Sequence, residues 1–480
     1  MTNHMPKQTL TILHTNDIHS HFEKMGSIAA MIQREREQAE PGEEILVLDI
    51  GDHMDRMAVE TEGSMGGANV DVLNLTGYDA ITIGNNEGLT FTPDILDQAY
   101  AGLLCKVVCG NLIEERSGQP PAWMEPSTIL TKGDIRIGIL GSTAPFSAFY
   151  ELLGMKVLNP IETLKLQVTQ IREQADIVIL LSHLGLTTDQ RIAEQIDGID
   201  MILGGHTHHV LEEPLEINKT LLCGAGKYGQ YLGKITVERS SEEEHFKLVS
   251  GGCLPVDDNL LHENVAAAII THREQAENKL GRTIAVTDRT LAIHWDRESS
   301  FGNLLAQAVR QFTGTDLAVV NAGQLLGDLE EGNITEGMLH ALCPSPINAC
   351  TILLKGADLR TAMEESLIPE YRDLVFKGFG FRGYQLGVLC IDGAELHYDP
   401  TKAPYERITE LNIGGVPLND EQLYRVGTLD MFTFNVGYQS LSLGSEPAYR
   451  LPEFIRDLIA MELKRPNSLD ECLRQRWILE

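Results

Sequence analysis

The sequence has few positive charges for its length. Its 480 residues contain 38 Lys and Arg against 69 Asp and Glu, a formal net charge of −31. Because nucleic-acid binding depends on clustered Lys and Arg that displace counterions from phosphates, this balance excludes nucleic acid as a general partner. No run of about 18 apolar residues occurs, so the sequence predicts no membrane-spanning helix and no membrane partner. No apolar segment of the signal-peptide type precedes the first strand-like run, which favours a cytoplasmic location.

Cysteine pairs with metal-site or disulfide spacing are also lacking. The eight cysteines are scattered over the chain, and the pair Cys105 and Cys109 has neither zinc-knuckle spacing nor a second pair nearby. We interpret them as small buried side chains in a reducing compartment. The oligomeric state is left open by the sequence.

The N-terminal half alternates short apolar runs with amphipathic stretches. Strand-like runs are Thr9–His14, Ile45–Asp49, Ala80–Ile83, Lys106–Cys109, Ile135–Leu140, Ile177–Leu181 and Met201–Leu203. Helical patterns lie between them at Gly26–Gln38, Ile161–Gln174 and Asp189–Gln195. Continuously apolar strands separated by helices are typical of sheets covered on both faces, so this half is predicted to be a layered α/β domain.

A change of pattern follows residue 255. Residues 259–281 read as one long, polar helix that links two domains. Beyond it come more Gly and Pro, short strands (Ala318–Asn321, Thr351–Leu354, Gln385–Ile391) and helices (Phe301–Phe312, Leu451–Glu462). We therefore predict a catalytic domain at 1–255, a linking helix at 256–282 and a mixed α+β domain at 283–480.

Five polar clusters come directly after predicted strands. They are Thr15-Asn-Asp-Ile-His19, Gly51-Asp52-His53, Gly84-Asn85-Asn86-Glu87, Ser182-His183-Leu-Gly185 and Gly204-Gly-His206-Thr-His208. Each motif alone is more often turn or cap chemistry. Because the carboxyl ends of strands in α/β sheets meet in one crevice, all five together predict a single site.

The residue types in these clusters are metal ligands. Aspartate, asparagine and histidine supply oxygen and nitrogen donors for divalent Mn²⁺, Zn²⁺, Fe²⁺ or Co²⁺, among which the sequence does not choose. We expect the Asp17-Ile-His19 and His206-Thr-His208 segments to be extended, so that alternate side chains face the same side.

The order Asp-x-His, Gly-Asp, Gly-Asn-x-Glu, His and Gly-His-x-His resembles that of the calcineurin-like metallophosphoesterases. The two-domain layout is similar to the 5′-nucleotidase and UDP-sugar hydrolase family. The resemblance implies a four-layer α/β/β/α sandwich followed by a domain for substrate specificity. It also implies two divalent metal ions. One would be held by Asp17, His19, Asp52 and His208, and the other by Asp52, Asn85, His183 and His206, with Asp52 bridging.

The chain departs from the family at its catalytic pair. The family's third motif has His where this sequence has Asn86, and nucleotidase members have Asp where it has Leu89. Asn86 is still a candidate catalytic residue, since its amide can donate a neutral hydrogen bond to a phosphoryl oxygen. It cannot supply a charge or a proton.

The C-terminal domain departs as well. The family's Asn-Gly-Gly-x-x-Arg is replaced by Asn321-Ala-Gly-Gln-Leu-Leu326, which removes a phosphate-binding arginine. Family members sandwich the base between two aromatic rings, and Phe381 and Phe432 are the candidates by position. Phe432 could equally be a core aromatic. Arg382 is a candidate for the missing phosphate contact.

The sequence thus predicts a hydrolase that depends on two metals and cleaves phosphoester or pyrophosphate bonds. The resemblance implies that its substrates are small nucleotides or UDP-sugar-like compounds and that its role is in nucleotide catabolism. Activity is expected to be reduced because the His–Asp pair is absent. The alternative is a non-catalytic module that binds metal and nucleotide and has lost turnover.

Overall fold

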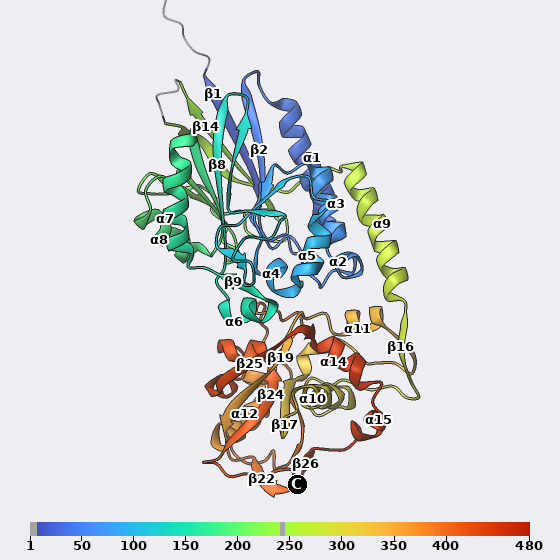
Figure 1. Cartoon of the computed structure of the whole chain (residues 1–480). Helices are drawn as coiled ribbons and strands as arrows, with labels where there is room; N and C mark the ends of the chain where they lie inside the picture. Colours follow the sequence, from blue (N-terminus) through green and yellow to red (C-terminus); the bar gives the residue numbers. More distant parts are fainter. Residues whose placement is uncertain (1–6, 241–244) are drawn as a thin grey trace, which may run out of the picture. The chain divides into compact units, whose positions relative to one another are not determined.

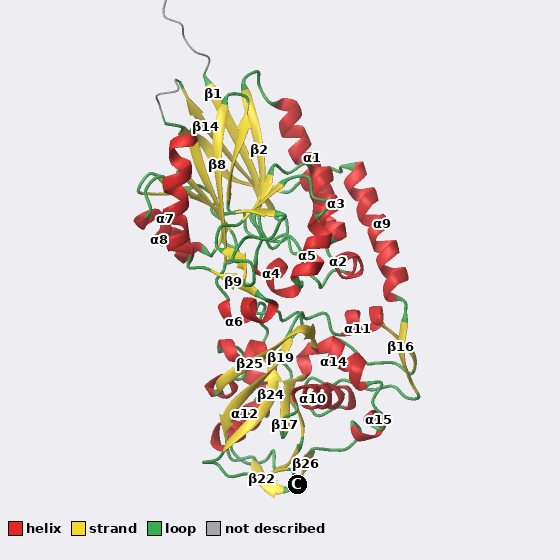
Figure 2. Ribbon diagram, viewed as in Figure 1, coloured by secondary structure: helices red, strands yellow, loops and turns green. Residues whose placement is uncertain are grey.

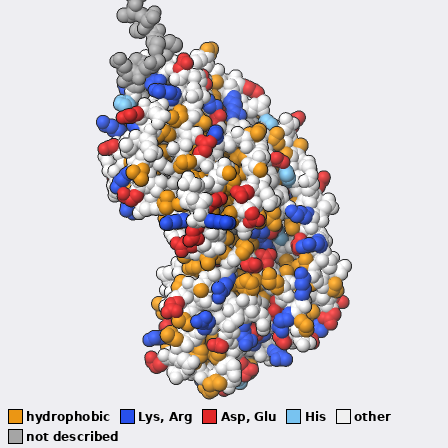
Figure 3. All heavy atoms as spheres, viewed as in Figure 1, with side chains coloured by type: hydrophobic (Ala, Val, Ile, Leu, Met, Phe, Trp, Pro, Cys, Tyr) orange, Lys and Arg blue, Asp and Glu red, His pale blue; other side chains and the backbone are white. Residues whose placement is uncertain are grey.

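A computed structural model of the chain describes residues 7–240 and 245–480, and the chain divides between Ala276 and Glu277 into an N-terminal and a C-terminal unit (Figure 1). None of the helices in these residues combines the length and the apolar composition needed to cross a bilayer. On the face that Figure 3 draws, Lys and Arg side chains are scattered among acidic ones.

Two stacked sheets form the middle of the N-terminal unit. The described strands of the first are, in spatial order, β15 (Lys247–Pro255), β14 (Tyr231–Arg239), β1 (Gln8–Thr15), β2 (Glu43–Asp49), β3 (Ala80–Ile81), β4 (Lys106–Val108) and β6 (Met124–Glu125). Those of the second are β12 (Leu215–Ile217), β13 (Thr220–Cys223), β11 (Met201–Gly204), β10 (Ile177–His183), β8 (Ile135–Thr143) and β7 (Ser127–Lys132). A separate antiparallel pair joins β5 (Leu112–Glu114) to β9 (Met155–Val157).

Helices cover the outer face of each sheet, as Figure 2 shows. The helices of this unit are α1 (Phe22–Gln38), α2 (Val59–Ser64), α3 (Gly67–Thr76), α4 (Asn85–Thr90), α5 (Pro93–Tyr100), α6 (Ser147–Tyr150), α7 (Pro160–Ile171) and α8 (Leu186–Gln195). One apolar cluster joins α1, α3 and α5 to the first sheet, and another joins α7 and α8 to the second. A third lies between the sheets. The order of layers is therefore α/β/β/α, as the resemblance implied.

Strand β10 explains why these strands are apolar up to their carboxyl ends, where Ser182 and His183 begin a polar cluster. Ile177, Ile179 and Leu181 belong to the cluster between the sheets. Val178 and Leu180 belong to the cluster under the helices. Successive side chains of a strand point to opposite faces, so a strand covered on both sides has no polar position.

The linking helix α9 (Glu263–Leu280) leads to the mixed C-terminal unit. The described strands of its larger sheet are β20 (Leu389–Asp392), β17 (Leu317–Asn321), β24 (Leu423–Leu429), β19 (Asn348–Lys355) and β25 (Ser445–Phe454). A smaller sheet holds β23 (Val416–Pro417), β22 (Ile408–Ile413), β21 (Ala394–Tyr398) and β26 (Trp477–Leu479), and β16 (Thr283–Thr287) pairs with β18 (Gly332–Thr335). The helices are α10 (Ser300–Thr313), α11 (Glu336–Leu342), α12 (Gly356–Ser366), α13 (Pro369–Arg372), α14 (Ile455–Glu462) and α15 (Ser468–Glu471).

One predicted helix has the wrong start. The sequence pattern placed it at Leu451–Glu462, but α14 begins at Ile455 because the preceding residues complete β25. Phe454 pairs with Asn348 in β19, and its backbone N–H donates to the Asp457 carboxylate at 2.8 Å. This side-chain acceptor marks the start of the helix.

Candidate metal centre

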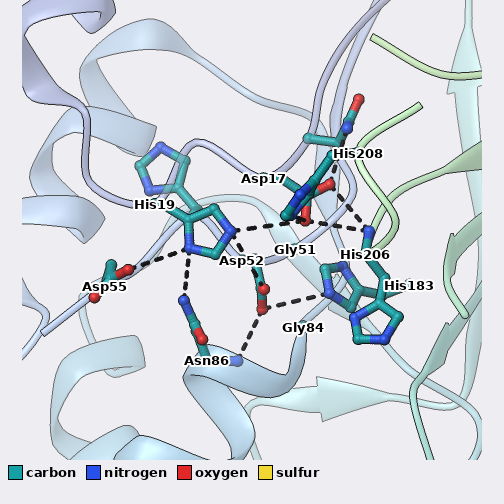
Figure 4. Close-up of polar contacts among 12 residues, drawn as sticks. Asp17, His19, Gly51, Asp52, Asp55, Gly84, Asn86, His183, His206 and His208 are labelled. Atoms are coloured by element: carbon teal, nitrogen blue, oxygen red, sulfur yellow. Dashed lines mark hydrogen bonds and ion pairs between the residues drawn. The ribbon is translucent and has the colours of Figure 1, made fainter. Parts of the chain in front are cut away.

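The aspartates and histidines among the predicted ligands lie together where strands of both sheets end (Figure 4). The predicted ligands follow or end β1, β2, β3, β10 and β11 in turn: Asp17 and His19, Asp52, Asn85, His183, and His206 and His208. Two groups have donor atoms within 4.8 Å of one another, namely Asp17, His19 and His208, and Asp17, Asp52 and His183.

The Asp52 carboxylate lies between two imidazoles. Its Oδ2 is 3.6 Å from Nε2 of His19, and its Oδ1 is 3.4 Å from Nε2 of His183. The two oxygens of one carboxylate thus face ring nitrogens supplied by different sheets. This is the arrangement needed for a carboxylate that bridges two cations.

Asp17 is the second carboxylate of the cluster. Its Oδ1 lies 3.4 Å from Nε2 of His208, and its two oxygens accept the backbone N–H of His206 at 3.1 and 3.0 Å. The His206 ring is 5.2 Å from that of His183, measured between centroids. Asp17 therefore holds the β11 loop against the β1 loop.

Three buried donor atoms in the cluster have no hydrogen-bond partner among the described residues: Nε2 of His19, Nε2 of His183 and Oδ1 of Asn85. A buried polar atom without a partner is costly, so native structures keep such atoms for a ligand or an ion. Imidazole nitrogens, an amide oxygen and two carboxylates form a donor set that suits divalent cations. The residues present therefore fit the metal ions that the sequence implied.

The other nitrogen of each ring has a partner that orients it. Nδ1 of His183 lies 2.8 Å from the carbonyl oxygen of Ile50. Nδ1 of His19 lies 3.3 Å from Oδ2 of Asp55 and 2.7 Å from the Asn86 amide nitrogen. The carbonyl partner of His183 favours a proton on its Nδ1, which leaves Nε2 free for a metal. At His19 the Asp55 carboxylate favours the same tautomer, whereas the Asn86 amide nitrogen donates only to an unprotonated Nδ1. Asp55 was missed by the sequence analysis, although it follows Asp52 at a three-residue interval.

The charges of the cluster shift its pKa values in opposite directions. Burial is the largest single influence on Asp52 and favours its neutral form, but the charges of His183 and His19 and the hydrogen bonds to the carboxylate together outweigh it and lower the pKa of Asp52. Burial likewise favours neutral His183, but the charges of Asp52 and Asp17 and the hydrogen bonds of the ring together outweigh it and raise the pKa of His183. The pKa of His19 is raised for the same reason, with the Asp55 contact as the largest favourable cause. His206 differs: burial and the His183 charge lower its pKa to about 4.

The segments that carry the ligands are not extended as predicted. Asp17, His19, Asp52, His206 and His208 all have φ between +48° and +69°. Left-handed backbone is uncommon for residues with a Cβ and gathers at functional sites. The side chains thus converge because the backbone turns sharply after each strand, and not because alternate residues of a strand share a face.

A buried glutamate joins two of these turns. One carboxylate oxygen of Glu87 accepts the backbone N–H groups of Asp52 and Gly84, at 3.0 and 2.9 Å, and the other accepts that of Met54 at 2.7 Å. A Cβ on Gly84 would lie 2.0 Å from Oδ1 of Asp52, so only glycine fits. Burial, followed by the Asp52 charge, raises the pKa of Glu87 to about 7.

His206 lies outside the two donor groups, and so do the remaining histidines near the motifs. His53 is buried, its Nδ1 is 3.2 Å from the Asn69 amide nitrogen, and burial lowers its pKa to about 3. His21 contacts the Glu23 carboxylate at 2.6 Å. His209 is exposed, with Nδ1 2.9 Å from Oγ1 of Thr207.

The aromatic candidates in the C-terminal unit are core residues in this structure. Phe381 is 1% exposed and stacks on Phe376, and Phe432 is fully buried. As placed, neither ring has a free face for a base, because neighbouring side chains of the core cover both. Arg382 is half-buried, its backbone N–H donates to Oγ of Ser345, and its Nη1 donates to the Phe381 carbonyl.

Comparison with known proteins agrees with this geometry. Residues 10–210 match the calcineurin-like phosphoesterase family, and residues 275–440 match the 5′-nucleotidase C-terminal domain. YunD of Bacillus subtilis, an uncharacterized metallophosphoesterase, is 35% identical over 460 residues, 95% of this chain and 99% of YunD. The chain belongs to the calcineurin-like metallophosphoesterases of the 5′-nucleotidase family. Members of this family are hydrolases that use two divalent metal ions.

More distant relatives of this metallophosphoesterase span both units. A 5′-nucleotidase of Bos taurus is 25% identical over 483 residues, covering 87% of this chain and 81% of that protein. Among solved structures, the NAD nucleotidase of Haemophilus influenzae shares the fold with a TM-score of 0.71 at 16% identity, covering 99% of this chain and 100% of the other.

Substitution of Asp52 should remove metal more completely than any other single change in the cluster. After loading with Mn²⁺, elemental analysis should find about two ions per chain in the wild type. Asp52→Asn should retain well under one ion, because one carboxylate faces ring nitrogens on both sides. His209→Ala, which removes an exposed imidazole beside the cluster, is the matched control and should bind like the wild type. Equal metal content in Asp52→Asn and His209→Ala would contradict the bridging assignment.

Metal binding by this phosphoesterase should also release protons. The pKa of His183 is raised to about 10, which keeps a proton on this ring near neutral pH in the metal-free protein, and the pKa of His19 is shifted in the same direction. A metal binds neutral imidazole, so each proton must leave, and affinity should fall as the pH is lowered. Calorimetric titration with Mn²⁺ at pH 7, in two buffers of different ionisation enthalpy, measures the release, which should be about one proton or more. A binding heat that is independent of the buffer would show that the rings are already neutral.

Proposed function

We propose that this protein is a hydrolase that depends on two metal ions and cleaves phosphoester or pyrophosphate bonds of nucleotides or nucleotide sugars. The observation that carries the proposal is the buried Asp52 carboxylate between two imidazoles whose Nε2 atoms have no hydrogen-bond partner among the described residues. One ion would be held by Asp17, His19, Asp52 and His208, and the other by Asp52, Asn85, His183 and His206. When bound, the two ions stabilise charge on the phosphoryl oxygens and lower the pKa of an attacking water.

The site supports turnover better than binding alone. A module that only bound metal and nucleotide would need neither a carboxylate shared by two ions nor several ligands held in left-handed backbone. Such strain persists where the surrounding structure maintains it, as the Glu87 carboxylate does for the Asp52 and Gly84 turns. A cytoplasmic location is part of the same proposal, and the eight cysteines, which are free thiols in this structure, suit a reducing compartment.

Asn86 and Leu89 stand at the positions of the family's catalytic His–Asp pair, and both make structural contacts there. The Asn86 backbone N–H donates to Oδ1 of Asp52 at 2.8 Å, and its side chain contacts His19. Leu89 packs against the apolar core on the same short helix. Asn86 thus positions two predicted ligands, and neither residue can transfer a proton. General acid–base assistance is typically worth about 10²–10⁴ in rate. Neither Asn86 nor Leu89 on α4 supplies it here.

Leaving-group chemistry should therefore decide which substrates turn over. With Mn²⁺ bound, we expect UDP-glucose or p-nitrophenyl phosphate to be hydrolysed about 10²-fold or more faster than AMP, because a poor alkoxide leaving group needs the missing proton. A steady-state comparison of kcat/KM across these three substrates tests this. AMP hydrolysis as fast as that of the best pyrophosphate compound would show that another group supplies the proton.

Specificity for the base is proposed to reside in the C-terminal unit, on a different aromatic pair from the one the sequence suggested. Phe379 is 56% exposed and stacks on the half-buried Phe434, with centroids 5.7 Å apart and planes 25° apart. Both lie two residues from the earlier candidates, Phe381 and Phe432. A base could stack on the exposed Phe379 ring, and such stacking is tolerant of base identity.

Phe379→Ala should raise the KM for a nucleotide substrate roughly tenfold, since one base–aromatic stack is worth about 1–3 kcal/mol. The KM for inorganic pyrophosphate, which has no base, should not change. Val375→Ala is the matched control, because Val375 is 70% exposed in the same loop and offers no ring. Steady-state kinetics with both substrates separate the effects, and an equal loss on both would argue against a base-stacking role.

A further inference from the structure

The loop between β13 and β14 is fastened to the segment that carries Asp17. The backbone N–H of Tyr228 donates to the carbonyl oxygen of Asp17 at 2.8 Å. The side chain of Asn16 donates to the carbonyl oxygen of Gly226 at 2.6 Å and accepts the backbone N–H of Ala225 at 3.1 Å. The loop thus belongs to the metal site, although it contains none of the predicted ligands.

Tyr228 packs its ring against the histidines of this site. Its centroid lies 5.6 Å from that of His19, 6.4 Å from that of His208 and 4.2 Å from that of His21. The residue has φ +59°, a strained conformation for a bulky side chain. With this backbone conformation, the Tyr228 ring lies beside the predicted ligands His19 and His208.

Lys227 lies on this ring. Its Nζ is 4.7 Å from the Tyr228 centroid, a cation–π contact, and both residues are half-buried. The flexible stem of a lysine lets the ammonium move between such a contact and a nearby anion. The ammonium therefore lies on a ring whose neighbours include the rings of His19 and His208.

A cation at this position would offset the negative charge around the site. The cluster contains the buried carboxylates of Asp17, Asp52 and Asp55, and the whole chain has a formal net charge of −31. These charges repel an anionic substrate. The family position that carries a histidine is the neutral Asn86, whose amide is engaged with His19.

We infer that Lys227, whose ammonium lies over the Tyr228 ring, binds phosphoryl oxygens of the substrate. Lys227 thereby supplies the positive charge that the neutral Asn86 cannot supply. This rests on the proposed phosphohydrolase function and adds a substrate-binding residue to it. The ligand chemistry is a phosphate or pyrophosphate group. Lysine binds such groups as a point charge and stabilises the charge of the transferring phosphoryl group.

The test uses the full-length protein loaded with Mn²⁺ and inorganic phosphate as the probe. Lys227→Met should weaken phosphate binding, measured by calorimetry, by about 10- to 100-fold, the range expected for a lost hydrogen bond between charged groups. Lys227→Arg should restore most of it. Metal content should equal that of the wild type in both variants. Lys219→Met removes an exposed lysine in the turn between β12 and β13 and should bind phosphate like the wild type.

A second measurement, of the KM for p-nitrophenyl phosphate, tests the role of the Tyr228 ring. Tyr228→Leu removes the ring under Lys227 and should raise the KM for p-nitrophenyl phosphate in the same direction as Lys227→Met. The inference is overturned if Lys227→Met binds phosphate within twofold of the wild type. If the metal-loaded wild type neither binds phosphate nor hydrolyses any of the esters, the proposed function fails and the inference fails with it. If the wild type turns over substrate and Lys227→Met binds phosphate and hydrolyses the ester equally well, the proposed function stands and only the role of Lys227 is rejected.

Discussion

Buried negative charge is the constraint on which the rest of this site depends. Asp17 and Asp52 are almost completely enclosed, and a carboxylate taken out of water must be compensated by positive charge or by several hydrogen bonds. In the structure the compensation comes from imidazoles and backbone N–H groups. Those imidazoles need neighbours in turn, such as Asp55 beside His19. Two divalent cations would satisfy the same carboxylates more fully, which is why the cluster is best explained as a metal centre.

The two stacked sheets position the two halves of this cluster next to each other. Asp17 and Asp52 follow β1 and β2 of the first sheet, while His183 ends β10 and His206 and His208 follow β11 of the second sheet. Packing between the sheets fixes the distance between these ends, because the apolar layer has no room for sliding. Glu87 then locks the Asp52 and Gly84 turns to each other through three backbone N–H groups. Precision at the site therefore comes from strand packing first and from buried hydrogen bonds second.

The sequence predicted the strands and the position of the ligand clusters well, for a physical reason. An apolar run such as Ile177–Leu181 can only be a strand or helix covered on both faces, and polar motifs directly after such runs must lie at sheet ends. It did not predict the left-handed backbone at Asp17 and His208, because nothing local distinguishes it from an extended segment. Asp55 and Lys227 were missed because their roles depend on contacts with His19 and Tyr228 that only the fold creates. Phe381 and Phe432 are enclosed in the core, whereas Phe379 is exposed, and a loop has no periodicity from which the sequence could separate the two cases.

The central claim is that this cluster holds two cations with Asp52 between them. Anomalous diffraction at the manganese edge, from crystals of the full chain grown with Mn²⁺, tests it most directly. We expect two peaks, one bordered by Asp17, His19 and His208 and the other by Asn85, His183 and His206, with the Asp52 carboxylate touching both. A single peak, or peaks away from Asp52, would contradict a pair of cations bridged by Asp52.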